Sequence, residues 1–380
     1  MSVKWQKVKL GDLGRVVTGA TPPTKHSEYF DGDYLFVTPS DLEYDSRNIL
    51  QSERTISQQG FEKFKNRFVP VGAVMYTCIA SIGKMGIATS NVLTNQQINS
   101  IVPSDEVDGC FLYYLLRNET PKIQGVNAGC AVPIINKRDF EAIEVTIPPL
   151  PVQKKIASIL SAYDDLIENN RRRIAILEEM ARKVYRKRFG GKKANGTIAE
   201  LASANDECYK AGSLPSEINY VDIASVSTGR IDGKTRMDAK NAPGRARRIA
   251  RHGDVIWSNV RPNLRAYALV LSPEAKDVFS TGFTVLRAAG NLYSYLYLTV
   301  TQDKFVSYLE GCVSGATYPA VRPDDFLRAE VYVPSNDERL EFQELTEPLY
   351  DQVCTLSEEN CKLAEARDAL LPKLMSRMPV

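Results

Sequence analysis

Hydrophobic side chains recur every seven residues in two long stretches of this chain. The first stretch, residues 152–189, contains neither proline nor glycine, and the second follows Pro334. An apolar repeat with this spacing is typical of a coiled-coil seam, where one stripe of each helix faces a partner helix. The predicted seam positions are Ile156, Tyr163, Leu177, Val184, Phe342, Leu349, Leu356, Leu363 and Leu370. We therefore predict two long helices, the first of which ends at the Gly190-Gly191 pair.

The stretches that precede these helices have a different pattern. Short apolar runs bounded by glycine and proline, such as residues 34–37 and 254–257, predict buried strands. Residues 111–116 and 293–298 are aromatic-rich segments with helical spacing. Each stretch is long enough to bury an ordinary hydrophobic core. We expect two globular domains of mixed strands and helices.

The second half of the chain repeats the first at a constant spacing of 186 residues. The segment Gly129, Pro133, Asp139, Phe140, Glu144, Val145, Pro148 recurs as Gly315, Pro319, Asp325, Phe326, Glu330, Val331, Pro334. The same spacing relates the seam positions of the two helices, so the duplicated unit includes a domain and its helix. The predicted fold class is mixed α+β, with two similar α/β domains at 1–150 and 191–335. Helices at 151–190 and 336–380 complete a pseudo-two-fold internal repeat.

The two predicted helices carry opposite charges. Residues 171–188 hold eight Lys/Arg and two Glu, a net charge of +6, whereas residues 336–368 hold ten Asp/Glu and three Lys/Arg, a net charge of −7. Opposite charges along the flanks of two seams attract, so we predict one intramolecular, antiparallel coiled coil. The alternative, two separate solvated helices, leaves both leucine seams exposed.

Composition narrows the class of protein. The 380 residues are 43% hydrophobic and carry a net charge of only +2, so a polyanion-binding surface has to come from local clustering. No apolar run is long enough to span a membrane, and lysines 4, 7 and 9 interrupt any signal-peptide core. The seven scattered cysteines contain no C-x-x-C pair. We expect a cytoplasmic protein without a zinc site.

Catalytic motifs are missing from the sequence. Gly233-Lys-Thr235 ends like a P-loop, but Thr228 stands where the first glycine is required, and no G-x-G-x-x-G occurs. Only two histidines, His26 and His252, are present, which gives little support for a Ser-His or Cys-His site. We interpret the acidic pair Asp164-Asp165 as a helix-start or solvated-face feature rather than a nuclease metal site. The sequence predicts a protein that is not an enzyme and holds no cofactor or metal.

Basic residues cluster in one segment of the second domain. Residues 230–265 contain ten Lys/Arg and three Asp, a net charge of +7. Such clustering in a near-neutral chain is typical of a nucleic-acid surface, although a solvated loop full of ion pairs is the alternative. The stretch 77–84 is its counterpart in the first domain, and the amides at 95–97 could read adenine or bond internally. The candidate DNA-binding residues are Thr77, Ser81, Lys84, Gln96, Gln97, Arg245, Arg247, Arg248, Ser258, Asn259, Arg261, Asn263 and Arg265.

The chain resembles the specificity (S) subunit of type I restriction-modification systems over essentially its whole length. The segments that carry the resemblance are Trp5 with 8–13, 19–22, 145–151 with Gln153, and 371–376. The second domain departs from the pattern at 334–337, where the proline-rich boundary is degenerate.

This resemblance implies a non-catalytic DNA-targeting subunit. Each target recognition domain would read one half of a bipartite double-stranded DNA site, and the helices would set the spacer. Two modification (methyltransferase) subunits, which carry S-adenosylmethionine, would dock on this chain, and restriction subunits using ATP and magnesium would join them. The alternative from a different class is a coiled-coil scaffold that joins two protein-binding domains.

Overall fold

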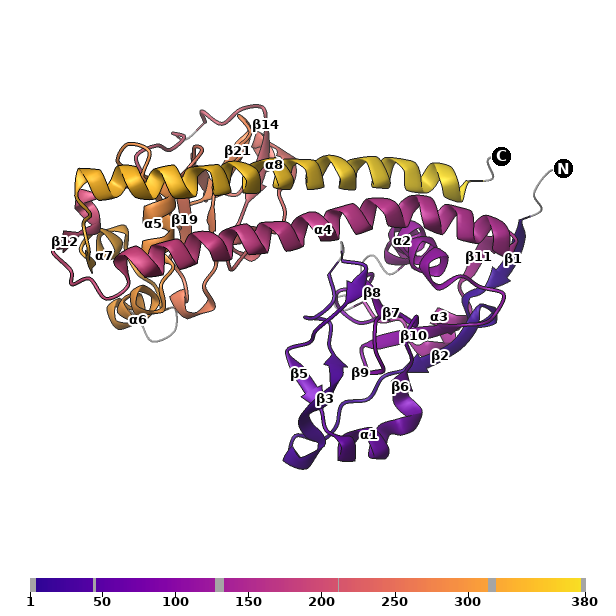
Figure 1. Cartoon of the computed structure of the whole chain (residues 1–380). Helices are drawn as coiled ribbons and strands as arrows, with labels where there is room; N and C mark the ends of the chain where they lie inside the picture. Colours follow the sequence, from indigo (N-terminus) through magenta and orange to yellow (C-terminus); the bar gives the residue numbers. More distant parts are fainter. Residues whose placement is uncertain (1–4, 44–45, 127–132, 211, 314–318, 377–380) are drawn as a thin grey trace. The chain divides into compact units, whose positions relative to one another are not determined.

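The computed structural model describes residues 5–43, 46–126, 133–210, 212–313 and 319–376. Gly129 and Gly315, the first residues of the repeated segment, lie outside the described residues. The chain divides into two compact units, the first formed by residues 1–169 and 360–380 and the second by residues 170–359 (Figure 1). Each unit therefore combines one globular domain with a portion of both long helices.

The first unit is built around two sheets. The five-stranded sheet has the order β2 (Gly14–Thr18), β10 (Ile98–Pro103), β7 (Val74–Thr77), β8 (Met85–Ala88) and β4 (Asn48–Ile49). The four-stranded sheet has the order β5 (Arg54–Ile56), β3 (Phe30–Val37), β9 (Val92–Thr94) and β6 (Phe68–Val69). The strands β1 (Gln6–Lys9) and β11 (Glu144–Ile147) form a separate antiparallel pair. The helices are α1 (Gln58–Phe64), α2 (Gly109–Val126) and α3 (Lys137–Glu141), with short 3-10 turns that include η1 (Leu10–Asp12), η2 (Ser27–Tyr29) and η3 (Lys65–Arg67).

The second unit repeats this plan. One four-stranded sheet has the order β13 (Ala202–Ala204), β22 (Phe283–Ala288), β19 (Val255–Ser258) and β20 (Tyr267–Leu269). The other has the order β17 (Thr235–Asp238), β14 (Glu217–Val221), β21 (Asp277–Ser280) and β18 (Ala246–Arg248). Two-stranded pairs join β12 (Gly196–Thr197) to β23 (Glu330–Val331) and β15 (Val226–Ser227) to β16 (Arg230–Ile231). The helices are α5 (Tyr293–Val300), α6 (Asp303–Cys312) and α7 (Pro323–Leu327).

The two units share their strand pairing as well as their element order. In each, the second sheet contains one parallel pair, β3 with β9 and β14 with β21, inside otherwise antiparallel connections. In each, an apolar aromatic helix packs into the main core, α2 in the first unit and α5 in the second. The predicted mixed α+β fold is confirmed, and the two units repeat one element order.

The two long helices are α4 (Leu150–Phe189) and α8 (Asn336–Met375), and they pack side by side and antiparallel. Within the second unit, Arg188 bonds Glu341 at 2.6 Å and Asn170 bonds Glu359 at 3.4 Å, so the sequence numbers run in opposite directions. Every predicted seam residue is buried or half-buried. Phe342 and Leu356 are 1% and 3% exposed, as expected for side chains that pack into holes on the partner helix.

A buried ion pair links the helices inside the first unit. Arg367 on α8 is 1% exposed and its guanidinium bonds the carboxylate of Asp164 on α4. The hydroxyl of Tyr114 on α2 donates to the other oxygen of the same carboxylate. The interpretation of Asp164 as a solvated-face residue is therefore wrong. The heptad pattern contained no signal for this pair, because its partners come from elements far apart in the chain. Asp165, the other half of the acidic pair, is exposed and bonds Arg47 at 2.5 Å.

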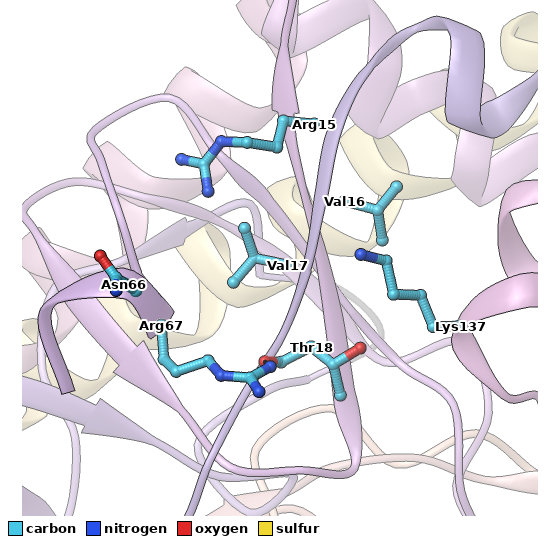
Figure 2. Close-up of a pocket in the computed structure, with 7 residues that line it drawn as sticks. All are labelled: Arg15, Val16, Val17, Thr18, Asn66, Arg67 and Lys137. Carbon is cyan, nitrogen blue, oxygen red and sulfur yellow. Dashed lines mark hydrogen bonds between the residues drawn. The ribbon is translucent and has the colours of Figure 1, made fainter.

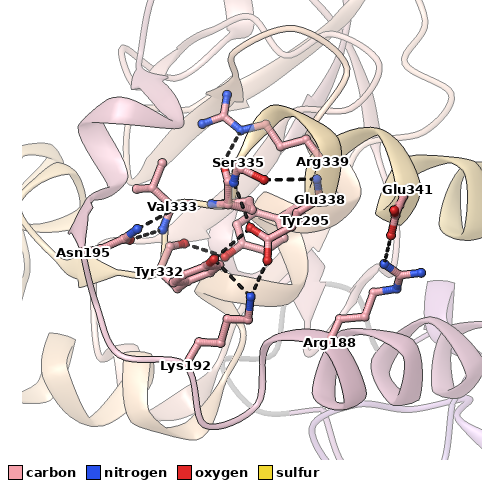
Figure 3. Close-up of polar contacts among 11 residues, drawn as sticks. Arg188, Lys192, Asn195, Tyr295, Tyr332, Val333, Ser335, Glu338, Arg339 and Glu341 are labelled. Atoms are coloured by element: carbon pink, nitrogen blue, oxygen red, sulfur yellow. Dashed lines mark hydrogen bonds and ion pairs between the residues drawn. The ribbon is translucent and has the colours of Figure 1, made fainter.

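The start of α8 is held by a capping box (Figure 3). The Ser335 N–H donates to Glu338 Oε2 at 2.9 Å, and the Glu338 N–H donates to Ser335 Oγ at 3.3 Å. The ammonium of Lys192 and the hydroxyl of Tyr332 also bond this carboxylate. Ser-x-x-Glu is a recognised helix-start pattern. The boundary that looked degenerate at 334–337 is thus defined by polar caps in place of prolines.

Candidate nucleic-acid interface

One loop of each unit has the same backbone geometry. Ala80 in the first unit and Arg261 in the second both have positive φ values, 61° and 50°, which are uncommon for residues other than glycine. The Ala80 N–H donates to the carbonyl of Pro133 at 3.0 Å, and the Arg261 N–H donates to the carbonyl of Pro319 at 2.9 Å. The two loops, residues 77–84 and 258–266, are therefore equivalent parts of the duplicated fold.

Side chains inside the two loops also play equivalent roles. Thr77 and Ser258 are fully buried, and their hydroxyls bond main-chain groups of their own loops. The Asn259 amide oxygen accepts a 2.6 Å bond from Thr284. These candidate residues shape the loops from inside, which leaves direct contact with a ligand to the loop tips.

The tip of the second loop presents an exposed mixture of charge and apolar surface. The side chains of Arg261, Asn263 and Leu264 are exposed, the last at 62%. Arg265 instead pairs with Asp303 at 2.6 Å. Arginine and asparagine suit guanine and adenine edges, and an apolar side chain suits the thymine methyl group. Leu264 was not among the predicted site residues, and the signal for it is an apolar residue in a polar loop.

Ion pairs neutralise much of the basic segment 230–265. Six of its ten cations have acidic partners: Arg230, Lys234, Arg236, Lys240, Arg251 and Arg265. The remaining four are Arg245, Arg247, Arg248 and Arg261, and none of them has an ion-pair partner among the residues the structure describes. The alternative of an ion-paired solvated segment thus holds for the stretch that contains β16 and β17. The candidate interface of the second unit therefore consists of the arginines at 245–248 and the tip of the loop 258–266.

The arginines at 245–248 lie on and before β18. Arg245 is exposed, and the Arg247 guanidinium donates to the Gly244 carbonyl at 3.2 Å. The Nε of Arg248 is buried without a hydrogen-bond partner in the described part of the chain, and burial lowers the pKa of this guanidinium from its usual value. A guanidinium without a carboxylate partner can bind a polyanion directly, because no carboxylate has to be displaced first.

A buried network supports the strands behind the second loop. The Arg287 guanidinium on β22 bonds Asp254 at 2.7 and 3.0 Å and Glu207 at 2.5 Å. The hydrogen bonds that Arg287 donates to Asp254, followed by the one that it donates to Glu207, raise the pKa of Arg287. Asp254 therefore acts inside the fold, and it subtracts nothing from the positive charge of the loop that follows β19.

The candidate amides of the first unit lie on the turn 95–97 between β9 and β10, outside the loop 77–84. Gln96 is exposed and its side-chain oxygen accepts a hydrogen bond from Thr21. Gln97 is half-buried and accepts from Asn95 at 3.3 Å. Lys84 donates to the Pro39 carbonyl at 3.4 Å, and Ser81 is half-buried. Amides suit adenine edges, so the 95–97 turn offers a different chemistry from the arginine-bearing loop tip of the second unit.

Close packing explains one glycine of the first loop region. A Cβ atom at Gly19 would lie 2.1 Å from the Asn95 carbonyl oxygen, so only glycine allows the chain to approach this closely. The next residue, Ala20, donates its N–H to the Thr94 carbonyl at 2.8 Å. Residues 19–21 thereby fix the position of the 95–97 amides.

Within the described ranges, no group of three or more His, Cys, Asp or Glu side chains is placed to hold a metal ion. Over the same part of the chain, no helix has both the length and the apolar character needed to cross a membrane. The P-loop-like Lys234 is engaged by Glu274 and Asp277, at 2.9 and 2.7 Å. The candidate chemistry of these loops is recognition.

Comparisons with known proteins agree with a recognition function. Residues 2–179 match the type I restriction modification DNA specificity domain family. The chain is 28% identical over 408 residues to the type I restriction enzyme MjaIX specificity subunit of Methanocaldococcus jannaschii, covering 98% of this chain and 92% of the relative. It is 30% identical over 175 residues to the HindI specificity subunit of Haemophilus influenzae, covering 44% of this chain and 38% of the relative.

The fold has a solved relative as well. The crystal structure of the type I restriction-modification system S subunit from M. genitalium matches with a TM-score of 0.55 and 17% identity, over 98% of this chain and 96% of that one. Two domains with different loops on one scaffold define a class of modular DNA-recognition proteins. Within that class, the chain belongs to the specificity (S) subunit family of type I restriction-modification systems. It is a DNA specificity subunit with target recognition domains, and such subunits are non-catalytic, which confirms the expected class of protein.

Proposed function

We propose that each unit reads one half of a bipartite DNA site through the major groove. The domains at 1–150 and 191–335 would act as the two readers. The helices at 151–190 and 336–380 would set the number of unread base pairs between the halves. The cytoplasm, where the genomic DNA lies, is the expected location.

The observation that carries this proposal is the pair of equivalent loops with unequal tips. Ala80 and Arg261 occupy the same strained backbone position, and Pro133 and Pro319 provide the same anchor. A duplicated scaffold with different exposed side chains suits two different short sequences, because base edges are distinguished by the donors and acceptors that reach them. The rival reading as a protein scaffold has no comparable explanation for this pattern.

We place the docking surface for the modification subunits on the long helices. Ile176 and Met180 lie one turn apart on α4 and are 61% and 47% exposed. Leu340 and Leu345 on α8 are 60% and 46% exposed. Exposed apolar side chains on an otherwise charged helix surface favour a protein partner. Two modification subunits would bring S-adenosylmethionine and the methyltransferase chemistry, and restriction subunits would bring the ATP- and magnesium-dependent steps.

Binding measurements on half-scrambled DNA test this function. The complex of this chain with its modification subunits would be titrated with the cognate duplex and with duplexes in which one half or the other is scrambled. Mapping methylated bases in the host genome supplies the cognate site. We expect each scramble to weaken binding and the logarithm of the affinity to fall steeply with the logarithm of salt concentration. A single contiguous motif, or binding that is insensitive to salt, would exclude the bipartite mechanism.

A further inference from the structure

A cationic pocket lies on the first unit, outside the loops discussed so far (Figure 2). Its volume is about 460 Å³, and residues of β2, the edge strand of the five-stranded sheet, form part of its lining. Arg15 comes from this strand, Asn66 and Arg67 come from η3, and Lys137 comes from α3. None of the described residues that line the pocket is acidic. Three chain segments far apart in sequence thus bring three positive charges to one hollow.

The three cations differ in how firmly they are held. Arg67 donates from Nη1 to the Thr18 carbonyl at 3.2 Å, which places its guanidinium at the end of β2. Lys137 faces Glu141 one turn along α3 at 3.5 Å, a long and exposed contact. Arg15 makes no ion pair or side-chain hydrogen bond with any other residue that the structure describes. Most of the hydrogen-bonding capacity of these groups is therefore available to an anion.

The pocket adjoins the 77–84 loop and the 95–97 turn of the same unit. Across the sheet, Thr18 on β2 is in register with Asn99 on β10, and Asn99 is in register with Tyr76 on β7. The Thr18 end of β2 is therefore level with the start of the 77–84 loop. Beyond Thr18 the chain continues to Thr21, whose hydroxyl bonds Gln96. Arg15 is three residues further back, about 10 Å along an antiparallel strand.

The second unit lacks this group of cations at the equivalent place. Strand β13 corresponds to β2, and Ser203 pairs with Arg287 as Arg15 pairs with Val102. The Arg287 guanidinium is already bound to Asp254 and Glu207. The position 186 residues after Lys137 is Pro323. The two units therefore distribute positive charge differently, on the recognition loop and β18 in the second unit and beside the loop in the first.

We propose that this pocket binds a backbone phosphate of the DNA half-site read by the first unit, an inference that rests on the proposed function. A domain that reads bases with amides still needs cations to hold the duplex in register, because phosphate contacts position the protein while base contacts specify the sequence. Arg67 would hold the phosphate next to the 95–97 turn. Arg15 and Lys137 would neutralise the adjoining phosphates of the DNA backbone. Free inorganic phosphate shares this chemistry, and protection of an open sheet edge by charge is a structural alternative.

The test uses salt-dependent DNA binding by the assembled complex. We would compare the wild type with Arg15→Ala, with Arg15→Ala/Arg67→Ala, and with Lys122→Ala, an exposed cation of α2 outside the pocket, as the control. Each lost phosphate contact should make the slope of log affinity against log salt shallower by about 0.9. We expect a change of about one unit for the single variant, about two for the double variant and none for the control, with discrimination between bases unchanged. The single variant should fold normally, because its substitution removes no ion pair or side-chain hydrogen bond among the described residues.

Several outcomes would overturn the proposal. A double variant with the wild-type slope, in a complex that still reads both half-sites, eliminates the phosphate pocket while leaving the proposed function intact. A wild-type complex without sequence-specific DNA binding defeats both. Calorimetric titration with inorganic phosphate forms a separate arm, and binding that is lost in the variants without any change in the DNA slope would identify a small-anion site. If the variants aggregate and their slopes are unchanged, the cations instead prevent edge-to-edge pairing of the sheet with another chain.

Discussion

Ala80 and Arg261 occupy the same backbone position in the two units, each with positive φ and each donating its N–H to a proline carbonyl. The two residues are 181 positions apart, five fewer than the 186 positions that separate Pro133 from Pro319. The difference is absorbed between the strands, where the chain is free to vary in length. The scaffold is therefore conserved between the units while the side chain presented at its tip is not.

This relationship predicts a unit-specific effect of Arg261. Arg261→Ala should weaken binding through the second half-site by about 10- to 100-fold, because one base-reading arginine contributes about 1–3 kcal/mol of discrimination. Arg265→Ala should have a smaller effect, since this side chain is paired with Asp303. Methylation assays on duplexes that vary only one half-site measure the difference. Equal methylation by wild type and Arg261→Ala would remove this residue from the interface, and Arg236→Ala, which loses only a surface pair with Glu217, is the matched control.

The buried pair between Asp164 and Arg367 predicts a large loss of stability on truncation. Arg367→Ala leaves the Asp164 carboxylate buried without its cation, which costs about 3–5 kcal/mol in comparable pairs. Arg188→Ala also removes an α4–α8 ion pair, but an exposed one, and should cost less than about 1 kcal/mol. Urea unfolding of the two variants gives the comparison. Similar losses would mean that the buried pair carries no special weight.

The 186-residue relation gives this pair a second meaning. The positions equivalent to Asp164 and Arg367 are Tyr350 and Ala181, both buried in the core of the second unit. A charged pair in one unit thus replaces an aromatic and a small side chain in the other. Single buried polar groups in coiled coils are known to specify register. The pseudo-symmetric helices are therefore chemically distinct at this level, which favours one pairing of each half-helix.

Lengthening both helices should lengthen the DNA spacer. Four residues inserted after Asn169 and four after Glu359, where Asn170 and Glu359 face each other, add about 6 Å of helix and slightly more than one turn. We expect the preferred spacer to grow by one or two base pairs while both half-sites stay the same. Methylated-motif mapping of a strain that carries the variant reads the spacer directly. An unchanged spacer would refute the role of the helices as a ruler.

The cap of α8 predicts an acid-sensitive helix start. Hydrogen bonds from Lys192, the Ser335 backbone and Tyr332 lower the pKa of Glu338 from 4.5 to about 2. Because the folded state favours the carboxylate, this contribution is complete above about pH 4.5 and is lost as the pH falls towards 2. Glu338→Gln should flatten the pH dependence of the unfolding free energy in that window. Glu344→Gln, which removes an exposed carboxylate of the same helix, should leave the dependence as it is.

Periodic features of the sequence were sufficient to predict the architecture. Seven-residue spacing depends only on which side of a helix each residue faces, so the seam from Ile156 to Leu370 could be recognised without any knowledge of the fold. The opposite charges of the two helices then indicated an antiparallel pair. The Ser-x-x-Glu pattern at 335–338 is a further local signal, and it indicates the start of α8.

Local patterns could not determine which charges are free. Arg261 and Arg265 look alike in the sequence, yet among the described residues only Arg265 has an acidic partner. That partner, Asp303, is 38 residues away on α6. The pocket formed by Arg15, Arg67 and Lys137 likewise assembles from three distant segments. Ion pairing is a property of spatial neighbours, which the order of residues does not specify.

The sequence by itself determined the class of this protein, because duplication, heptad phase and net charge are properties of residue order. Only the tertiary structure decided that Asp164 is buried, that Thr77 and Ser258 support their loops from inside, and that Ala80 and Arg261 are equivalent. Each of these depends on whether a polar group meets water or another polar group once the strands have paired. Burial and hydrogen bonding at that distance follow from the packing of the whole unit.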